Sequence, residues 1–307
     1  MALPVEIRKT IDMCRHCFMC RHANPTFLVT KLDAHTPRGY ALGLSRIDDG
    51  LASWDDDLAS KLYQSTLDGL CSELCEFDWR EDLVVQVGRA EAVRAGMAPE
   101  AAERAAERRF VGAPDSFASP PIAADRLDRE GAEILFLTGL DARERAPETI
   151  SATAAILDHL GCDWTAMSVE GDPGIDLWEL GHDEAAARAS AHFSAAVARL
   201  DPARIVTGSS RVARALREPL PASITIDAEV EHLSEFLAPR VSAPEDAGAT
   251  EQAAVGVVAY HDPCSLGRRL GVYDDPRKVI EKITGVAPAE FFHSRGEAEC
   301  CGDGGLL

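Results

Sequence analysis

Nine cysteines are grouped in this chain of 307 residues, and the groups constrain the fold more than any other feature. Cys14, Cys17 and Cys20 are separated by two residues each, and Cys300 and Cys301 are adjacent near the C-terminal end. The first residues contain no long apolar run of the kind that a secretory signal needs. An odd number of clustered cysteines without such a signal indicates metal binding rather than a disulfide framework.

The length and charge of the chain limit the classes of protein to which it can belong. A length of 307 residues with 46% hydrophobic and 27% charged residues is typical of a globular protein of about two domains. The formal net charge is −20, of which −4 falls in residues 1–110 and −16 in residues 111–307. This charge excludes nucleic acid and anionic membrane as main partners. No apolar run approaches the ~18 residues of a membrane span, so we expect a cytoplasmic protein with no direct membrane span.

Breaks in composition divide the chain into predicted domains. A stretch rich in Pro, Ser and Ala separates the two halves, and a second, acidic stretch rich in Ala, Gly and Pro covers residues 241–252. We therefore expect a helical domain over residues 1–112, a linker over 113–127, an α/β domain over 128–241 and a partial domain over 253–307. Helices are predicted in the first domain over residues 55–69, 80–95 and 99–110.

Short apolar runs alternate with helical patterns after the linker. This alternation predicts a parallel sheet covered by helices, with ligands at the carboxyl ends of its strands. Thr138-Gly139, Thr207-Gly208 and Cys264 follow predicted strands and are expected at such ends. The predicted fold class is therefore multidomain α+β, with an α-helical N-terminal domain followed by α/β domains with parallel sheets. The predicted strands are residues 133–137, 164–169, 204–207, 223–226, 255–260 and 290–292, and the predicted helices are 147–160, 183–200, 209–217 and 276–283.

The three closely spaced cysteines are followed by Asn24, where the bacterial ferredoxin run C-x2-C-x2-C-x3-C has its fourth cysteine. In two-cluster ferredoxins that fourth cysteine ligates the other cluster, so the partner run should lie downstream. Residues 65–75 have the same spacing and supply a cysteine at the fourth position. The sequence therefore predicts one cubane [4Fe–4S] cluster and one vacated site. The cubane ligands would be Cys14, Cys17, Cys20 and Cys75, and the vacated positions are Ser65, Asp68, Cys71 and Asn24.

Zinc is the alternative metal for the first cysteine group. His16 and His22 lie beside the three cysteines, and zinc accepts mixed Cys and His ligands. Zinc sites usually close with a second ligand pair at nearer range, however, and the C-x2-C-x2-C triplet favours an iron–sulfur cluster. Cys71 and Cys162 are predicted to be buried packing residues rather than ligands.

A second cysteine group lies near the C-terminal end. Cys264 follows a predicted strand, and Cys300 and Cys301 precede a glycine-rich turn. A strand-end cysteine and a Cys-Cys loop can hold a further iron–sulfur site at the ligand edge of a sheet. The glycines would let backbone N–H groups approach the sulfides. We expect Cys264, Cys300 and Cys301 to form a partial metal site, and three separate buried cysteines are the alternative.

The segment HDPCSLGRRLGVYDDPRKVIEKITG, together with ECCGDGG, resembles the cysteine-rich CCG domain of heterodisulfide reductase subunits and related iron–sulfur oxidoreductases. The N-terminal half, with Thr36–Gly39 between its two cysteine runs, is similar to the helical ferredoxin module of the same proteins. The iron–sulfur subunits of glycolate oxidase and of anaerobic glycerol-3-phosphate dehydrogenase share this architecture. The resemblance implies an α-helical ferredoxin-like domain, two CCG-type α/β domains and electron transfer from a flavoprotein. Arg38 is predicted either to lie near the cubane or to be a solvated loop arginine.

The first CCG-like domain departs from the family pattern at its cysteine positions. Thr138–Asp141 stands where the family has a cysteine after the first strand, and Val169–Pro173 stands in place of Cys-Cys-Gly-Asp-Pro. Ser209–Val212 stands in place of the C-P-x-C run. We expect this domain to keep its scaffold and to have lost its cluster. The second domain has no closing C-x2-C, so either a tail is absent from the chain or the site is completed otherwise.

The cysteine motifs and their departures from the family pattern favour one function over two alternatives. The chain is predicted to be an iron–sulfur electron-transfer subunit that relays electrons from a flavoprotein dehydrogenase partner in a hetero-oligomeric complex to a downstream acceptor. No G-x-G-x-x-G follows a strand and no Walker run occurs, so no flavin or nucleotide is expected in this chain, and no catalytic residue is predicted. The alternatives are a non-catalytic assembly subunit with a structural cluster and a thiol/disulfide enzyme like heterodisulfide reductase. The acidic second half is expected to offer a docking surface to a protein partner.

Overall fold

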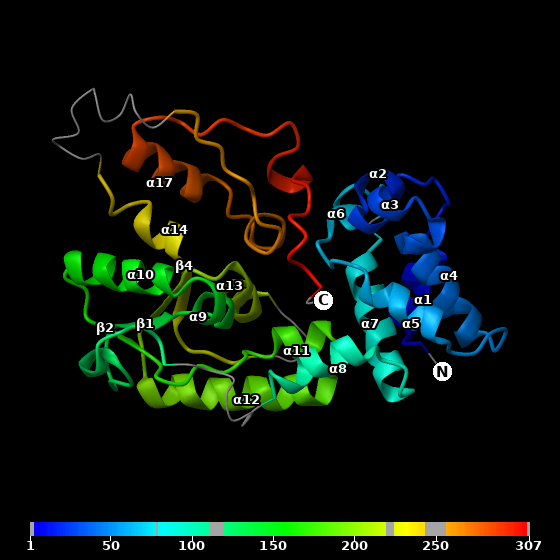
Figure 1. Cartoon of the computed structure of the whole chain (residues 1–307), viewed down its shortest axis with the longest axis horizontal. Coiled ribbons are helices and arrows are strands. Elements are labelled where there is room, and N and C mark those ends of the chain that lie inside the picture. The colour runs from blue at the N-terminus through cyan, green and yellow to red at the C-terminus, as the bar shows by residue number, and fades with distance from the viewer. Residues whose placement is uncertain (1–2, 78, 111–118, 219–223, 243–255, 306–307) are drawn as a thin grey trace. The chain divides into compact units, whose positions relative to one another are not determined.

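The chain forms two compact units in the computed structural model, which is drawn in Figure 1. The structure describes residues 3–77, 79–110, 119–218, 224–242 and 256–305. Unit 1 comprises Met1–Phe110, Asp176–Ala186 and Gly296–Leu307, and unit 2 comprises Val111–Ile175 and Ala187–Arg295.

Unit 1 is built from helices whose starts are fixed by polar side chains. Asn24, Thr36 and Asp55 each accept a hydrogen bond from the backbone N–H group three residues further on, which caps the N-terminus of a helix. Proline occupies the first turn of two of these helices, where no N–H donor is needed. The helices are α1 (Val5–Asp12), α2 (Cys20–Ala23), α3 (Pro25–Thr30), α4 (Pro37–Asp48), α5 (Asp56–Tyr63), α6 (Leu70–Glu73), α7 (Glu81–Arg94), α8 (Glu100–Glu107) and, apart from its first residue, α11 (Ile175–Glu179), with a 3-10 turn η1 (Asp33–His35).

Helix α7 lies at the centre of unit 1 and contacts α1, α4 and α5. A Cβ atom at Gly88 would lie 2.9 Å from the Leu44 side chain and 3.1 Å from that of Leu62, so glycine allows α7 to approach α4 and α5 closely. The apolar side chains of these helices form one core. Its buried members are Leu3, Ile7, Ile11, Tyr40, Ala41, Leu44, Leu62, Leu67, Trp79, Val84 and Val85.

Arg89 of α7 is fully buried in unit 1, and its guanidinium donates hydrogen bonds to backbone carbonyl groups. The acceptors are the carbonyl oxygens of Leu62 at 3.1 Å, Ser65 at 2.7 Å, Glu179 at 2.9 Å and Gly305 at 3.4 Å. Burial lowers the pKa of Arg89. Because the carbonyls come from separate stretches of chain, one side chain joins α5, the loop after it, the 176–186 segment and the C-terminal segment of unit 1.

The helix predicted over residues 55–69 is wrong at its C-terminal end, because α5 stops at Tyr63. The carbonyl oxygens of Leu62 and Ser65 accept hydrogen bonds from Arg89, which holds the chain in a non-helical path. The chain then turns through Leu67 and Gly69, whose φ angles are 52° and 77°. The helices predicted over residues 80–95 and 99–110 are confirmed as α7 and α8.

Unit 2 contains a parallel four-stranded sheet in the order β2-β1-β3-β4. Ile134 of β1 lies opposite Trp164 of β2 and Arg204 of β3, and Arg204 lies opposite Glu229 of β4. The strands are β1 (Ile134–Leu137), β2 (Trp164–Ala166), β3 (Arg204–Thr207) and β4 (Glu229–His232). The helices are α9 (Leu140–Arg145), α10 (Pro147–His159), α12 (Asp183–Leu200, mostly in unit 2), α13 (Ser210–Arg217), α14 (Leu233–Leu237), α16 (Gly267–Leu270) and α17 (Asp274–Thr284), with the 3-10 turns η2 (Ala124–Arg126) and η3 (Arg295–Glu297).

Alternate side chains of β1 enter two different apolar layers. Ile134 and Phe136 of β1 pack with residues of α10 and α14 on one face. Leu135 and Leu137 pack with residues of α12 and α13 on the other face. The sheet is thus buried on both sides, which is typical of parallel sheets. The multidomain α+β fold class is confirmed.

Several predicted strands of unit 2 need correction. The strand expected over residues 223–226 is wrong, because residues 224–226 are not in a strand and Ser223 lies outside the described residues. The strand of this region is β4, which begins at Glu229. Arg204 forms ion pairs with Glu229 and Glu231 at 3.2 Å, which fixes the register of β4 against β3 and gives this strand a polar sequence. The run at 164–169 is strand only as far as Ala166. In the described parts of 255–260 and 290–292 no strand forms, and a single bridge joins residues 259 and 289.

Within the described residues, no helix combines the length and the apolar character that crossing a membrane requires.

Replacement of Arg89 by Met is expected to lower the free energy of unfolding by at least about 2 kcal/mol, since charged hydrogen bonds to several buried carbonyls are lost together. The matched control is Arg108→Met, because Arg108 is exposed at the end of α8 and its replacement should stay within about 0.5 kcal/mol. Denaturant unfolding of both variants measures the difference. Equal stability of the two variants would contradict the role given to Arg89.

Candidate metal centre

The loop between α1 and α2 carries the first three cysteines in a strained backbone conformation. His16 and Phe18, on either side of Cys17, have φ angles of 58° and 64°. Left-handed conformations of non-glycine residues cost about 1–3 kcal/mol each and cluster at ligand-binding sites. Alternation of left- and right-handed residues also turns backbone N–H groups towards one side, as in many anion and iron–sulfur sites. The loop therefore has the backbone form of a ligand-binding loop, with Cys14 and Cys20 at its two ends.

Cys20 has the most protected of these three thiols. The pKa of Cys20 is raised to about 11, chiefly by burial; the backbone N–H group of Arg38 donates to its sulfur and opposes the shift, and the neighbouring Cys14 and Cys17 thiols contribute to it. The thiol is therefore protonated at neutral pH, and a metal that binds there must displace the proton. The sequence left open whether Arg38 approaches this site, and the structure places its backbone against Cys20.

Cys75, the predicted fourth ligand, follows α6 and packs against the core of unit 1. Within the described ranges, no three His, Cys, Asp or Glu side chains converge closely enough to hold a single metal ion. A cubane presents four irons, so its ligands lie further apart than those of a single ion such as zinc. His16 and His22, the predicted zinc partners, are exposed.

The positions predicted as vacated ligands are buried and engaged in structural hydrogen bonds. Ser65 donates to the Glu81 carboxylate at 3.0 Å, and Asp68 accepts from the N–H of Leu70 at 2.7 Å. Asn24 caps α3, as described above. The Cys71 thiol donates to the Cys20 carbonyl at 3.7 Å within a small apolar cluster of α2 and α6, and burial raises its pKa well above the usual range. Cys71 therefore has the buried environment predicted for it, and partly buried Cys162 packs on the core of unit 2.

The segment with Cys300 and Cys301 belongs to unit 1 and lies against the loop after α5. A Cβ atom at Gly304 would lie 2.1 Å from the carbonyl oxygen of Thr66, so only glycine permits this approach. The N–H of Gly302 donates to the Cys300 sulfur at 3.3 Å. Cys301 is exposed. Gly304 thus permits a close contact with protein backbone, and the expected approach of backbone N–H groups to cluster sulfides stays a prediction.

Cys264 lies in unit 2, three residues before the start of α16, in a turn that is anchored by Asp262. The Asp262 carboxylate accepts two hydrogen bonds from Arg277 at 2.7 Å each and one from the N–H of Arg295 at 2.7 Å. Burial alone would raise the pKa of Asp262, but these donors lower it overall. Asp262 therefore holds this turn against Arg277 of α17 and the backbone of Arg295. No disulfide joins any of the nine cysteines, all of which lie within described residues.

Three segments predicted as former ligand positions converge at the carboxyl end of the sheet of unit 2. The Glu170 carboxylate accepts hydrogen bonds from the N–H and hydroxyl of Thr138 and from the N–H of Gly139, all at 2.8 Å. A Cβ atom at Gly139 would lie 2.9 Å from that of Ser209. Arg143 forms an ion pair with Glu170 at 3.3 Å, and both side chains are at most 2% exposed. Instead of thiolates, this edge of the sheet holds a buried carboxylate and guanidinium.

Two arginines important to these sites were missed by sequence reasoning. Arg143 lies one helical turn beyond Gly139, and Arg277 bridges Asp262 and Glu290. Arg143 lies on α9, which directly follows Thr138-Gly139, and that spacing was the signal available; Arg277 lies on α17, beyond α16, and had no such local signal. Burial lowers the pKa of Arg143, whereas hydrogen bonds to Asp262 and Glu290 raise that of Arg277.

Comparison with known proteins places these motifs in context. Residues 258–307 match the model of the CCG cysteine-rich domain. The chain is 26% identical to a dihydromethanophenazine:CoB–CoM heterodisulfide reductase subunit of Methanosarcina barkeri, over 81% of this chain and 64% of that protein. It is 26% identical to a fumarate reductase (CoM/CoB) subunit of Methanothermobacter marburgensis, over 80% of this chain and 48% of that protein. It is 27% identical to the probable iron–sulfur-binding oxidoreductase FadF of Bacillus subtilis, over 59% of this chain and 26% of that protein. No solved structure matches.

The chain thus carries a CCG domain and is homologous to iron–sulfur oxidoreductase-type proteins, which confirms the resemblance read from the cysteine motifs. These relatives support an iron–sulfur cluster and an iron–sulfur redox role for the chain. The chain spans 64% of the length of the heterodisulfide reductase relative, so the activity of that whole protein is not assigned to it.

Replacement of Glu170 by Leu is expected to lower the free energy of unfolding by about 3–5 kcal/mol, because Arg143 is left buried without its carboxylate. The double variant Arg143→Met/Glu170→Leu should recover part of this loss, since it removes the unpaired buried charge but still leaves the N–H groups of Thr138 and Gly139 without an acceptor. Exposed Glu148 provides the control Glu148→Leu. Urea unfolding distinguishes the variants, and a double variant as unstable as Glu170→Leu would refute the account.

The free energy of unfolding of unit 2 is expected to decrease at pH values below about 4, where Asp262 is protonated. The folded pKa of Asp262 lies below its unfolded value of about 3.9, so its stabilising contribution is present above that pH and is lost as the pH falls through the folded pKa. Asp262→Asn should cost about 2 kcal/mol at pH 7, and this difference should shrink below about pH 4. Thermal unfolding from pH 7 to pH 3 measures the difference, and a constant gap would contradict the assignment.

Proposed function

We propose that the chain is an iron–sulfur electron-transfer subunit that relays electrons from a flavoprotein dehydrogenase partner to a downstream acceptor. In this proposal Cys14, Cys17, Cys20 and Cys75 hold one [4Fe–4S] cluster. Cys264, Cys300 and Cys301 are part of a second iron–sulfur site. The chain is one subunit of a hetero-oligomeric complex. It contributes both cysteine sites and no flavin, nucleotide or substrate-oxidising residue.

The conformation of the loop between α1 and α2 carries the proposal. Two left-handed non-glycine residues, His16 and Phe18, surround Cys17, and such strain persists where the surrounding structure requires a particular backbone path. The donor set is three thiols within seven residues, and Cys75 follows from the downstream run. Thiolate ligands of this kind suit iron–sulfur clusters, and the relatives are iron–sulfur proteins.

The residues around the thiols would set the reduction potential of the cluster rather than perform chemistry on a substrate. The cluster, when bound, supplies reversible uptake and release of single electrons. The backbone N–H of Arg38 donates to the Cys20 sulfur, and hydrogen bonds to ligand sulfurs raise reduction potentials. Cys20 is partly buried beside α6, which limits water at this ligand, whereas Cys17 is exposed. One side of the loop is therefore open to a partner.

An assembly role for unit 2 is the second candidate, and the Glu170–Arg143 pair favours it. A buried ion pair at the ligand edge of the sheet provides no redox centre there, so this part of unit 2 can contribute only structure. An assembly subunit would need the first cluster only to hold unit 1 together. The two candidates differ in whether that cluster changes oxidation state in use.

Replacement of Cys75 by Ser is expected to remove at least about half of the iron bound by anaerobically purified protein, because a cubane that loses one of four thiolates is poorly held. Electron paramagnetic resonance of the dithionite-reduced protein should lose the cubane signal together with the iron. The matched control is Cys162→Ser, since Cys162 packs on the core of unit 2 and is not a proposed ligand. Cys300→Ser should leave the cubane signal in place and affect only a second signal.

Three results would contradict the proposal or parts of it. Near-equimolar zinc without iron and sulfide would replace the iron–sulfur site by a zinc site. An unchanged cubane signal in Cys75→Ser would refute this ligand set. A cluster that dithionite reduces but that no physiological potential reaches would favour the assembly role over electron transfer.

A further inference from the structure

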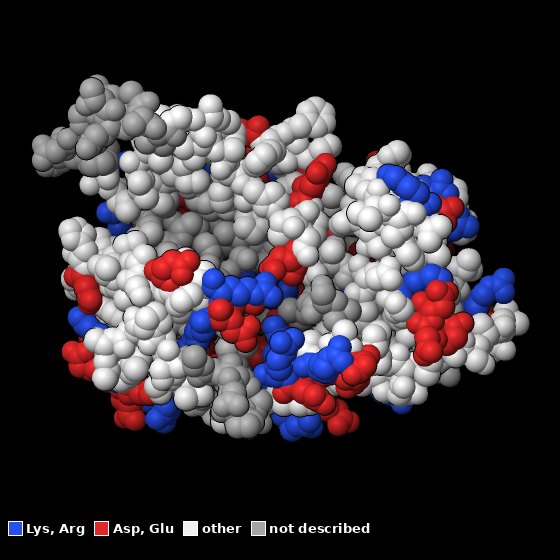
Figure 2. Space-filling model, in the orientation of Figure 1, with Lys and Arg blue, Asp and Glu red and all other residues white. Residues whose placement is uncertain are grey.

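The charge of unit 1 around the cysteine loop is opposite to that of the chain as a whole. Residues 13–47 contain five Lys or Arg residues and a single acidic residue, Asp33, so this stretch has a formal charge of +4 while the rest of the chain carries −24. In Figure 2, blue atoms gather over α2 and α3 with little red among them. We call this surface the basic island. Its cations are Arg15, Arg21, Lys31, Arg38 and Arg46.

Large apolar side chains are exposed on the same stretch of chain. Phe18 and Met19 of the cysteine loop are 39% and 41% exposed, Val29 is 84% exposed and Leu42 is 52% exposed. Single exposed apolar residues need no explanation, but several within one short stretch beside a cofactor loop indicate an interaction surface. The combination of exposed apolar groups with a surrounding ring of one charge is typical of a protein docking site.

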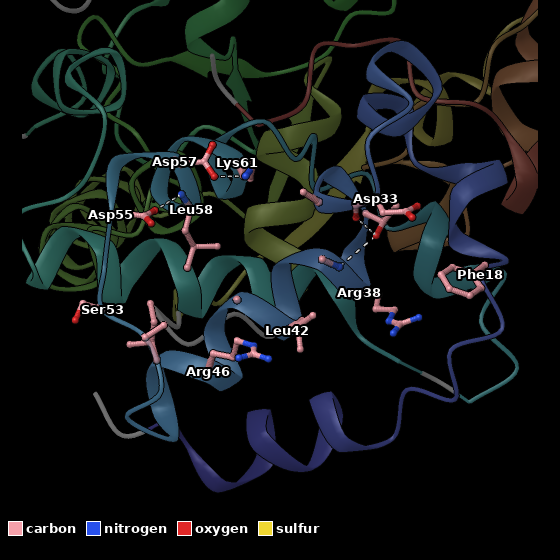
Figure 3. A pocket seen from close by; sticks show the side chains of 16 residues that line it. Phe18, Asp33, Arg38, Leu42, Arg46, Ser53, Asp55, Asp57, Leu58 and Lys61 are labelled. Atoms are coloured by element: carbon pink, nitrogen blue, oxygen red, sulfur yellow. Dashed lines mark hydrogen bonds and ion pairs between the residues drawn. The ribbon is translucent and has the colours of Figure 1, made fainter.

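A groove of about 520 Å³ lies between α4 and α5 and ends at the cysteine loop (Figure 3). Arg38, Leu42 and Arg46 follow one another along the α4 side, and Phe18 lies at the end nearest Arg38. Because the two arginines are eight residues apart on one helix, their Cα atoms are about 12 Å apart. The groove therefore presents two cations with an exposed leucine between them.

Two of the three acidic residues of the groove form ion pairs, whereas its two α4 arginines are available. Asp33 is paired with Arg21 at 2.5 Å, Asp55 accepts the N–H of Leu58, and Asp57 is paired with Lys61. The Arg38 guanidinium lies 4.9 Å from the Phe18 ring centroid, and in the described part of the chain neither Arg38 nor Arg46 has a carboxylate partner. The hydrogen bond to Asp55 leaves its negative charge in place, so two arginines face one unpaired carboxylate and the remaining charge of the groove is positive.

We propose that the basic island and this groove are the docking site for an acidic protein partner. The partner would lay a segment along α4 in which two carboxylates pair with Arg38 and Arg46 and an apolar side chain covers Leu42. The inference rests on the proposed function in one respect, since the site borders the cysteine loop through Phe18. A partner seated there would lie against the exposed side of that loop.

Flavodoxin, a small flavoprotein with an acidic surface, is a suitable probe because its net charge has the same sign as that of this chain. Net charges alone predict that association of the two proteins strengthens with salt, whereas a basic docking site predicts that it weakens. The dissociation constant for flavodoxin is measured by titration calorimetry at ionic strengths from about 0.01 M to about 0.15 M, over which the Debye length falls from about 30 Å to about 8 Å. We expect the dissociation constant to increase at least about tenfold across this range.

Arg46→Glu tests the groove without altering the cysteine loop, because Arg46 is exposed and lies two turns from Arg38. It should weaken binding at low ionic strength by about tenfold, and Arg46→Lys should stay within about threefold of the unaltered chain. The matched control is Arg108→Glu, which makes the same charge change at an exposed residue of unit 1 outside the basic island. Leu42→Ser should weaken binding with the salt dependence unchanged.

The outcomes separate this inference from the proposed function. Binding that strengthens with salt, or equal losses in Arg46→Glu and Arg108→Glu, would overturn the docking site. Binding of pyrophosphate with no binding of flavodoxin would make the groove a small-anion site and would also overturn it. The binding measurement does not depend on electron transfer, so a failure of the cluster assignment is detected independently by the iron analysis and the resonance signal of Cys75→Ser.

Discussion

The buried guanidinium of Arg89 is the interaction on which the arrangement of unit 1 depends. Burying a charge is costly unless hydrogen bonds compensate, and in the described part of the chain the hydrogen bonds of Arg89 go to backbone carbonyls. Three of the four acceptors lie in loops or at the last residue of a helix. If one of these stretches moved away, the buried guanidinium would lose that hydrogen bond. One of them leads to Cys75 and another follows Cys300 and Cys301. The positions of the cysteine-bearing segments of unit 1 are therefore determined by an arginine that is not a ligand.

The ion pair of Glu170 and Arg143 shows how a ligand edge can persist without thiolates. The N–H groups of Thr138 and Gly139 point to the end of the sheet and would be costly if left without an acceptor. Glu170 accepts both, and Arg143 balances the carboxylate charge. The backbone of the edge is thereby satisfied by protein alone. The same logic applies in unit 1, where Ser65, Asp68 and Asn24 are buried and hydrogen-bonded at the positions predicted to be vacated.

Sequence reasoning succeeded where the signal was local and failed where it depended on distant partners. Strands β1 and β3 and helices α7, α10 and α12 follow from apolar period and capping residues, and they lie close to where they were predicted. Strand β4 was missed because its sequence is polar, and its place is set by ion pairs with Arg204. The early end of α5 was missed because it depends on hydrogen bonds from Arg89 to backbone carbonyl groups. Every residue has a carbonyl group, so the sequence does not show which ones accept. Cysteine spacing indicated the metal chemistry, but no spacing could reveal the carboxylate that fills the sheet edge of unit 2.

The net charge of the chain is a poor guide to the face that a partner meets. At physiological ionic strength the field of a surface charge decays over about 8 Å, so a docking protein responds to the charges that it touches and little to those elsewhere. The acidic second half was expected to offer a docking surface, and the basic island gives unit 1 a surface of the opposite sign. An acidic partner would be repelled by most of this molecule and attracted at the island alone. The surrounding negative charge therefore adds to the specificity of the site, because it makes encounters at any other orientation unfavourable.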